Sequence, residues 1–417
     1  MLPTLSISVI LALFPNEMIS AMSTELIYWL SVLIPLVVMP VVLPMVVLLA
    51  RRKRLIDSPN ARKTQSRPVA VMGGTVMMLV LCTTAIVINL FYDISSLFPA
   101  FCVMVILYLF GMLDDTIGLS WQFKLGMQVF VILLLYYGGS YGVNSLFGLF
   151  GLDVLPEWLS LILTLFTGLL LLNAANFVDG IDGLASGLGV LAGLMMGYWN
   201  VRHGFITQAL LSFSMVGTMS TFFIFNVFSN RYKMYMGDSG SLVLGLFIYM
   251  SACPNSYYAL GNEFLADSYF VSFLLALFSA MIFDMVRVVV GRALNGKSPF
   301  HPDRTHLHHA YVDVGMTHLL ATLKITLQNM AVLAIWYVTA ILELNSALQY
   351  FIVLLAGVAF IWLPYIFLNL YKTSYRNMYA KISKRCKRRS DFLKSLTGWI
   401  TPVIDGRFRT RIMHSIK

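Results

Sequence analysis

The sequence predicts an all-α protein that crosses a membrane many times, and its composition and apolar segments carry this prediction. Of its 417 residues, 59% are hydrophobic and 12% are charged, and the mean hydropathy is +0.79. A soluble domain carries about 25% charged residues, and a bilayer span needs about 20 apolar residues. We expect about eleven spans, at residues 27–50, 70–92, 95–113, 125–140, 157–173, 184–200, 207–225, 240–254, 268–290, 318–342 and 347–370.

The distribution of Lys and Arg predicts the orientation, because cytoplasmic loops retain basic residues. Residues 1–50 contain no Lys or Arg, the loop at 51–69 contains seven, and the tail after residue 371 contains thirteen. An external N-terminus and a cytoplasmic C-terminus require an odd number of spans, which eleven satisfies. The predicted organisation is therefore an external segment at 1–26, a transmembrane domain at 27–370 and a basic cytoplasmic tail at 371–417.

This topology places the chemically interesting loops on one side of the membrane. The predicted cytoplasmic segments contain nearly all of the polar residues that interrupt the apolar pattern, and the predicted outer loops are short and plain. The function is thus expected to face the cytoplasm, in the segments 51–69, 114–124, 173–183, 226–239 and 291–317.

Two adjacent acids follow the third predicted span in the stretch LDDTIG. Ionisable groups at membrane depth are costly and indicate function by default, and acids at a helix C-terminus oppose the helix dipole. Asp114 and Asp115 therefore suit a hard divalent cation such as Mg²⁺ better than a capping role. Lys124 opens the next span and could neutralise these acids or bind a phosphate.

A second polar group ends the fifth span, in NAANFVDGIDGLASG. If the helix continues, Asn173, Asn176, Asp179 and Asp182 share one face because they are three residues apart. Gly180 lets the backbone bend and approach a ligand closely. A structural Asx turn would explain one of these residues, but not four within ten.

Asn226 and the stretch MYMGDSGS precede the eighth span. Asp238 lies in a glycine-flanked turn at a predicted helix start, where an N-cap is the structural alternative. Tyr235 has an aromatic ring of the kind that stacks on bases. These residues are candidates for holding an anionic ligand that contains a base.

Basic and histidine-rich loops supply candidate phosphate ligands. Lys63 and Arg67 lie between turn residues and a Gly-Gly pair, whereas Arg51 to Arg54 fit a role as topology anchors equally well. The stretch SPFHPDRTHLHH lacks the i, i+4 His pairing of zinc helices. An anion-binding loop is favoured instead, because imidazolium and guanidinium groups suit a pyrophosphate; its candidates are Arg304, His306, His308 and His309.

In this order, these motifs resemble those of the polyprenyl-phosphate N-acetylhexosamine-1-phosphate transferase family, over about residues 25 to 370. The PDRTHLHH stretch is similar to the branch that uses UDP-N-acetylglucosamine. The branch that transfers phospho-N-acetylmuramoyl-pentapeptide usually has three consecutive histidines, and Leu307 interrupts that run here. The chain also departs from the family at 65–68, where it has Gln-Ser-Arg-Pro in place of the commoner His-Lys-Arg-Pro.

The resemblance implies a bacterial enzyme of the inner membrane that starts lipid-linked cell-envelope glycans. Undecaprenyl phosphate would attack the β-phosphorus of UDP-N-acetylglucosamine and release UMP, directly or through a phospho-Asp. Mg²⁺, or Mn²⁺ in its place, would be the cofactor. The expected partners are these two substrates and membrane lipids, with no nucleic acid, and a homodimer is one assembly that we consider.

The resemblance also assigns roles to residues of the transmembrane domain. Asp238 would be the principal Mg²⁺ ligand with Asp115 near the metal, and Asp114 would be a base or would orient the lipid phosphate. Substrate contacts are expected from Lys63, Arg67, Lys124, Asn173 and Asn226. Asp179 and Asn176 would hold the diphosphate or the metal; Gly180, Asp182 and Tyr235 the uridine; and Arg304, His306, His308 and His309 the diphosphate or the sugar.

Two questions stay open at this level. The tail at 371–417 mixes Lys and Arg with Leu, Ile, Phe and Trp, as interfacial helices do, yet a solvated topology anchor fits equally well. A transporter for an anionic or nucleotide-sugar substrate is the main rival function. Transporters, however, have charges near the bilayer midplane and internal repeats, and neither pattern is found here.

Overall fold

The computed structural model describes residues 23–52, 56–57, 69–139, 141–253, 268–298 and 303–407. Each of the eleven predicted spans contains a helix or a pair of helices. These are α3 (Thr24–Arg52), α4 (Gly73–Asn89), α5 (Phe98–Ile117), α6 (Trp121–Gly139), α7 (Glu157–Val178), α8 (Leu184–Arg202), α9 (Ile206–Phe228), α10 (Gly237–Ala252), α12 (Phe270–Leu277) with α13 (Ser279–Leu294), α15 (His318–Ile341), and α16 (Ser346–Gly357) with α17 (Leu363–Ser374).

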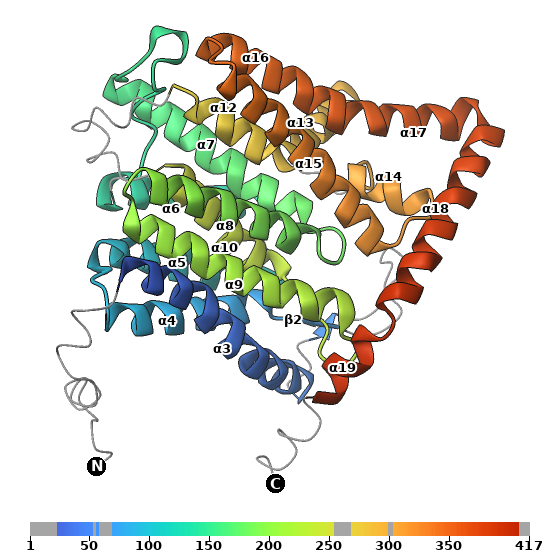
Figure 1. Ribbon diagram of the computed structural model, residues 1–417, viewed down its shortest axis with the longest axis horizontal. Coiled ribbons are helices and arrows are strands. Elements are labelled where there is room, and N and C mark those ends of the chain that lie inside the picture. The colour runs from blue at the N-terminus through green and yellow to red at the C-terminus, as the bar shows by residue number, and fades with distance from the viewer. Residues whose placement is uncertain are drawn as a thin grey trace.

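The chain is a polytopic α-helical membrane protein. Among the described residues, seven helices are long and apolar enough to cross a bilayer, or eight if α12 and α13 form one span bent by 72°. The helices lie side by side in one bundle (Figure 1). Large apolar side chains such as Val37, Ile86 and Phe166 point outward and are exposed, as lipid-facing positions require because the bilayer is itself apolar.

A small sheet departs from the all-α prediction. Strand β2 (Val69–Val71) pairs antiparallel with β1 (Ile56–Asp57) and parallel with β3 (Met234–Tyr235). The predicted span at 70–92 therefore begins with a strand, and its helix starts at Gly73. This pairing ties the first loop of the chain to the segment that leads into α10.

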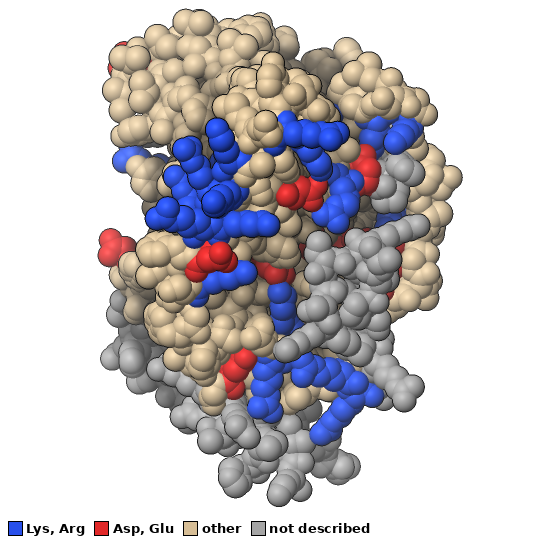
Figure 2. All heavy atoms as spheres, turned by 90° about the vertical axis from the view of Figure 1, so that its right-hand side faces the viewer, with Lys and Arg blue, Asp and Glu red and all other residues tan. Residues whose placement is uncertain are grey.

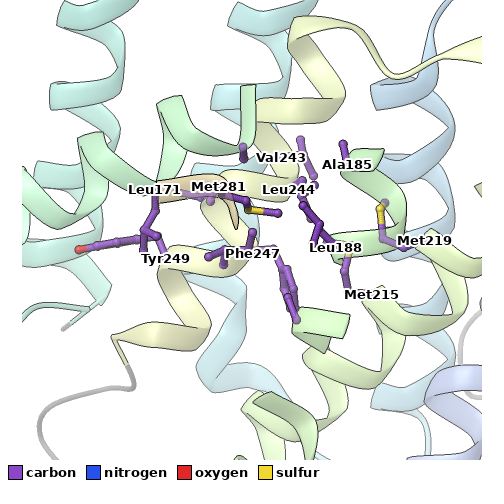
Figure 3. Close-up of a cluster of buried hydrophobic side chains, with 14 of the residues drawn as sticks. Leu171, Ala185, Leu188, Met215, Met219, Val243, Leu244, Phe247, Tyr249 and Met281 are labelled. Atoms are coloured by element: carbon purple, nitrogen blue, oxygen red, sulfur yellow. The ribbon is translucent and has the colours of Figure 1, made fainter. Parts of the chain in front are cut away.

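Helix α10 lies at the centre of the bundle, and it packs against α5, α7 and α4. Its residues Val243, Leu244 and Phe247 are fully buried, and Figure 3 shows them between side chains of α7, α8 and α9. At Gly245 the backbone of α7 comes so close that a side chain would collide with Leu172. The predicted span at 240–254 is thus an inner helix that its neighbours shield from lipid.

The glycine pair at the start of α4 has a packing role. A Cβ on Gly73 would lie 2.6 Å from the Cα of Met236, and one on Gly74 would lie 2.6 Å from the backbone nitrogen of Gly240. The N–H of Gly74 donates a hydrogen bond to the carbonyl of Met236 (3.1 Å). The pair therefore lets the starts of α4 and α10 touch.

Candidate active site

The structure brings together four of the five predicted cytoplasmic segments at one end of the bundle, which we call the loop face (right-hand side of Figure 1). Lys124 and Asn176 both reach Asp238, and Asp182 is paired with Lys233 and His318. The fifth segment joins them through Arg51, whose guanidinium donates to the carbonyl of Arg231 (2.7 Å). The clustering predicted from the span count is confirmed.

Asp115 holds the first turn of α10. Its carboxylate accepts hydrogen bonds from the N–H groups of Asp238 (2.7 Å) and Ser239 (3.1 Å) and from the hydroxyl of Ser239 (2.7 Å). These N–H groups have no partner within the helix, and a carboxylate at a helix N-terminus is favourable. In this arrangement Asp115 fixes the position from which Asp238 projects.

Lys124 lies between two acids from different helices. Its ammonium group forms ion pairs with Asp114 and with Asp238, the latter at 3.0 Å. Asp114 also accepts from the N–H of Leu119 (2.8 Å). The amide of Asn176 donates to the second oxygen of Asp238 (2.9 Å) and to the hydroxyl of Ser241 (2.9 Å). Asp238, whose side chain is a little over one third exposed, is therefore the acid on which these contacts converge.

Asp179 forms no ion pair with any described residue. It caps α7, and among the described residues its carboxylate has no hydrogen-bond or ion-pair partner. Burial and the nearby negative charges of Asp238, Asp182 and Asp115 raise the pKa of Asp179 well above its ordinary value. An unpaired carboxylate beside a second acid is an arrangement that a cation would stabilise.

Asp182 is already paired, which sequence alone did not predict. Its carboxylate binds the ammonium of Lys233 (2.6 Å) and Nδ1 of His318 (2.8 Å). Although burial raises the pKa of Asp182, the hydrogen bond from His318 and the charge of Lys233 hold that pKa below its ordinary value. We call these three residues the Asp182 clamp; it joins α15 to the segment between α9 and β3.

Residues 303–309, which we call the histidine loop and which lead into helix α14 (Leu307–Asp313), pack directly on Gly180. A Cβ on Gly180 would overlap the His308 ring, so glycine is required for this contact. Burial lowers the pKa of His308 well below its ordinary value, and burial together with the charge of Arg304 lowers the pKa of His309 to about 4. These two imidazoles are neutral near pH 7, so they offer N–H donors where the sequence suggested cationic rings.

We expect Gly180→Ala to reduce activity by roughly a hundredfold, because displacing a positioned group by about 1 Å costs that much. The added methyl group would push His308 away from the acids. Gly187→Ala is the matched control, since the nearest atoms to its Cβ lie 3.6 Å away in ordinary contact. Initial rates of both variants would check this, and equal rates would show that the contact between Gly180 and His308 is not needed.

Two charged residues of α13, which the sequence analysis missed, support the histidine loop. The carboxylate of Asp284 accepts from Nδ1 of His306 (2.9 Å) and from the N–H of Leu307 (3.0 Å). Arg287 donates to Asp284 (2.6 Å) and to the carbonyl of Thr305 (2.7 Å). Both lie inside the predicted span at 268–290, where a charged residue itself indicates function. They could therefore have been identified from the sequence.

A metal bound by imidazoles does not fit this cluster. Ligand atoms of Asp284, His306 and His308 lie within 4.8 Å of one another. The guanidinium of Arg287, however, already contacts the Asp284 carboxylate at 2.6 Å, and its positive charge opposes a second cation there. Asp284 therefore acts as the residue that orients His306, in the manner of a carboxylate that fixes a histidine tautomer.

We expect Asp284→Asn to lower kcat/KM by roughly 10- to 100-fold, the usual effect of losing a residue that orients a ligand-binding histidine. The change also leaves Arg287 without its counter-charge. Asp313→Asn is the control, because Asp313 forms only partly exposed pairs with Arg304 and Lys372. A rate for Asp284→Asn that matches the Asp313→Asn rate would remove Asp284 from the site.

The remaining predicted residues are distributed as follows. Arg304 is half-exposed and pairs with Asp313 (3.3 Å), outside the acidic cluster. Asn173 exchanges hydrogen bonds with Gln128. Asn226 accepts from the N–H of Gly183 and donates to the carbonyl of Met234, and so joins two segments of the loop face. Tyr235 lies in β3, beside Lys233. Lys63 and Arg67 lie outside the described residues.

A cavity of about 200 Å³ opens beside Asp238, between α5, α6, α7 and α10. One part of its wall is polar, with Asp114, Lys124 and Asn176, and the rest includes apolar side chains such as Leu107, Phe110 and Leu125. A ligand with an anionic head and an apolar chain would match both parts. The cavity therefore fits an amphiphile better than a soluble metabolite.

The fold and the site define a class of protein: a polytopic membrane enzyme that carries out phosphate chemistry. Its acids, lysine and asparagine surround one partly exposed carboxylate, and phosphoryl transfer depends mainly on such positioned charge.

Comparison with known proteins agrees. Residues 97–253 match the family model described as glycosyl transferase family 4. The chain is 31% identical over 302 residues to the decaprenyl-phosphate N-acetylglucosaminephosphotransferase of Mycobacterium leprae, an alignment that covers 67% of this chain and 75% of the relative. It is 29% identical over 283 residues to the undecaprenyl-phosphate α-N-acetylglucosaminyl 1-phosphate transferase of Escherichia coli K12, covering 67% and 74%. The chain belongs to the polyprenyl-phosphate N-acetylhexosamine-1-phosphate transferase family and is a glycosyl-1-phosphate transferase.

Proposed function

We propose that the protein transfers N-acetylglucosamine 1-phosphate from UDP-N-acetylglucosamine to a polyprenyl phosphate and releases UMP. The single observation that carries this proposal is the position of Asp238. It lies where Lys124 and Asn176 converge and where the amphiphilic cavity begins. The relatives are named as N-acetylglucosamine-phosphate transferases that act on undecaprenyl or decaprenyl phosphate, which supports the acceptor class and the sugar.

In this proposal the acceptor lies in the cavity. Its phosphate would meet Lys124, whose position Asp114 fixes through their ion pair, and its first isoprene units would contact the apolar wall. The lipid phosphate is anionic near neutral pH, so it can attack without a strong base. The bond from its oxygen to the β-phosphorus forms as the bond from that phosphorus to the bridging oxygen breaks, and UMP leaves.

The donor would lie between α10, the turn after α7 and the histidine loop. The neutral His308 and His309 can donate N–H groups to the diphosphate or the sugar, and Asp284 keeps His306 in one orientation. The Asp182 clamp and Tyr235 would contact the uridine. Asp115 holds α10 so that Asp238 faces the diphosphate.

The acids fit a magnesium ion, which we propose as the cofactor, with manganese as a substitute. Asp179 and Asp238 offer the hard carboxylate oxygens that Mg²⁺ prefers. A cation would also balance the unpaired negative charge of Asp179. A bound Mg²⁺ would neutralise the charge that develops on the diphosphate. Removal of divalent cations with a chelator should then abolish UMP release.

We also propose a finer topology in a bacterial inner membrane. It has eleven spans, an external N-terminus and a cytoplasmic C-terminus, and the loop face lies on the cytoplasmic side. The basic loop at 51–69 and the basic tail support this orientation. Labelling of single cysteines from either side of sealed vesicles would test it, and a tail that is labelled from outside would overturn it.

The proposed reaction is tested by a panel of UDP-sugars incubated with the purified protein, Mg²⁺ and polyprenyl phosphate. UMP should appear with UDP-N-acetylglucosamine and only when the lipid is present. If UMP appeared only with a different UDP-N-acetylhexosamine, that sugar nucleotide would be the donor in place of UDP-N-acetylglucosamine. Absence of UMP with every donor, from folded protein, would refute the proposal.

A further inference from the structure

The tail folds into two helices that the proposed reaction does not use. Helix α18 (Arg376–Thr397) follows α17 and runs across the ends of the spanning helices to α19 (Ile400–Arg407), along the right-hand edge of Figure 1. It lies on the loop face, where the acids also lie. Figure 2 shows this face and the Lys and Arg side chains that gather in one area of it.

One side of α18 docks on the protein. Cys386 and Ser390 are buried, and the hydroxyl of Ser390 accepts from the N–H of Thr317 (2.9 Å) and donates to the carbonyl of Gly315 (3.3 Å). Thr317 directly precedes His318, a member of the Asp182 clamp. The middle of α18 is therefore anchored next to one arm of that clamp.

Helix α19 is anchored next to the other arm. The carboxylate of Asp405 accepts from the hydroxyl of Ser229 (2.6 Å) and from the N–H groups of Asn230 (3.2 Å) and Arg231 (3.3 Å). These residues begin the segment that carries Lys233, the lysine of the clamp. The two contacts of the tail thus brace the Asp182 clamp from both sides.

The other sides of α18 are exposed and strongly basic. The helix has eight Lys or Arg and one acid, Asp391. At 3.6 residues per turn, one side carries basic and apolar residues together; these are Met378, Lys381, Arg385, Arg388, Phe392 and Leu396. Phe392 is 65% exposed and Leu396 is 53% exposed, and Trp399 follows just after the helix at 67%. We call this side the mixed side.

Exposed aromatic and aliphatic side chains among basic ones are unfavourable in water but match the headgroup region of a bilayer. Basic residues near the surface attract anionic lipids, and apolar residues enter the boundary of the acyl chains. Because α18 directly continues α17, which belongs to a bilayer-length apolar segment, it starts at the level of the headgroups. The composition of the mixed side and its location point to the same occupant.

We propose that the mixed side of α18 is a docking surface for anionic lipid headgroups, and that the docked tail holds the Asp182 clamp in place. Lipid contact on α18 would then be felt at the clamp through Ser390 and Asp405. The effect on catalysis rests on the proposed function, because it takes the clamp to be part of the donor site. Lipid docking itself stands independently of that function.

Hydrogen–deuterium exchange of the full-length protein tests docking without any activity. Nanodiscs of phosphatidylcholine alone are compared with nanodiscs that also contain phosphatidylglycerol. The anionic lipid should slow amide exchange in α18, in 229–235 and in 315–318. Raising the salt concentration should reverse the effect, because screening weakens surface charge. Exchange that is the same in both lipids would overturn the proposal.

Two triple variants with equal charge change define the surface. Lys381, Arg385 and Arg388 lie on the mixed side. Replacing all three by Gln should weaken lipid binding, and with it the protection from exchange, by up to about a hundredfold, because each basic residue at the surface contributes about 1 kcal/mol. The control replaces the exposed Arg376, Lys387 and Lys394 by Gln; these three residues share another side of the helix, away from the mixed side. If both triples lose protection equally, no particular side docks and the assignment is wrong.

The coupling is tested with Asp405→Ala and its control Asp391→Ala. Asp405→Ala should keep the lipid-dependent protection of α18 but lose that of 229–235, and it should raise the KM for the UDP-sugar more than it lowers kcat. Asp391→Ala should change neither. If α18 is protected and the KM of Asp405→Ala is unchanged, lipid docking stands and the brace is refuted. If neither the wild type nor any variant releases UMP, the proposed function fails, but the exchange result stays valid.

Discussion

Asp238→Ala should abolish turnover, with a loss of at least about a thousandfold in kcat, because it removes the acid on which the site converges. Loss of one positioned electrostatic group costs about 10²- to 10³-fold, and Asp238 is also a proposed holder of the metal. The fold should persist, since Asp115 still binds the backbone of the first turn of α10 and Lys124 keeps its pair with Asp114.

The control for this variant is Asp153→Ala, an exposed acid in the loop between α6 and α7. It should retain the rate of the wild type. UMP release and thermal unfolding of both variants would be measured side by side. Substantial turnover by a folded Asp238→Ala protein would mean that the acids serve the structure alone, and the active-site assignment would be wrong.

Asp179→Asn should change activity and stability in opposite directions. Turnover should fall by roughly 10²- to 10³-fold because a carboxylate near the diphosphate is lost. The fold should become more stable near neutral pH, because the negative charge of Asp179 has no partner among the described residues and lies close to Asp238, Asp182 and Asp115. Sites that are poised for a ligand commonly reduce stability in this way.

The sign of the pH dependence follows from the raised pKa of Asp179. When the folded pKa lies above the unfolded one, the ionised group destabilises the fold at pH values above the folded pKa, and the cost vanishes below the unfolded pKa of about 3.9. The melting temperature of Asp179→Asn should therefore exceed that of the wild type at neutral pH, and the gap should close towards pH 4. A variant that is less stable at neutral pH would contradict the unpaired charge.

The helices and the loop face could be predicted from the sequence because both depend on local composition. Apolar runs of bilayer length define the spans, and the distribution of basic residues groups the loops on one side. Asp114, Asp238 and Asn176 were found because polar residues in an apolar chain need an explanation. The 70–92 helix was misplaced at its start because strand pairing of Val69–Val71 with β3 depends on a partner more than 160 residues away.

The pairings inside the site could not be predicted, since each joins helices that are distant in the chain. Sequence spacing cannot show that Asp115 caps α10, that Lys233 and His318 hold Asp182, or that His308 needs Gly180 to be a glycine. The neutrality of His308 follows from burial, which only the fold reveals. Asp284 and Arg287 were different, because two charges within an apolar span were visible and were passed over.

The most direct test of the central claim follows the β-phosphorus of the donor. UDP-N-acetylglucosamine with a labelled β-phosphate would be incubated with polyprenyl phosphate and the purified protein in Mg²⁺. If the protein transfers a sugar phosphate, the label must appear in the lipid product and the released nucleotide must be unlabelled UMP. Release of labelled UDP would show sugar transfer without the phosphate, and it would contradict the account.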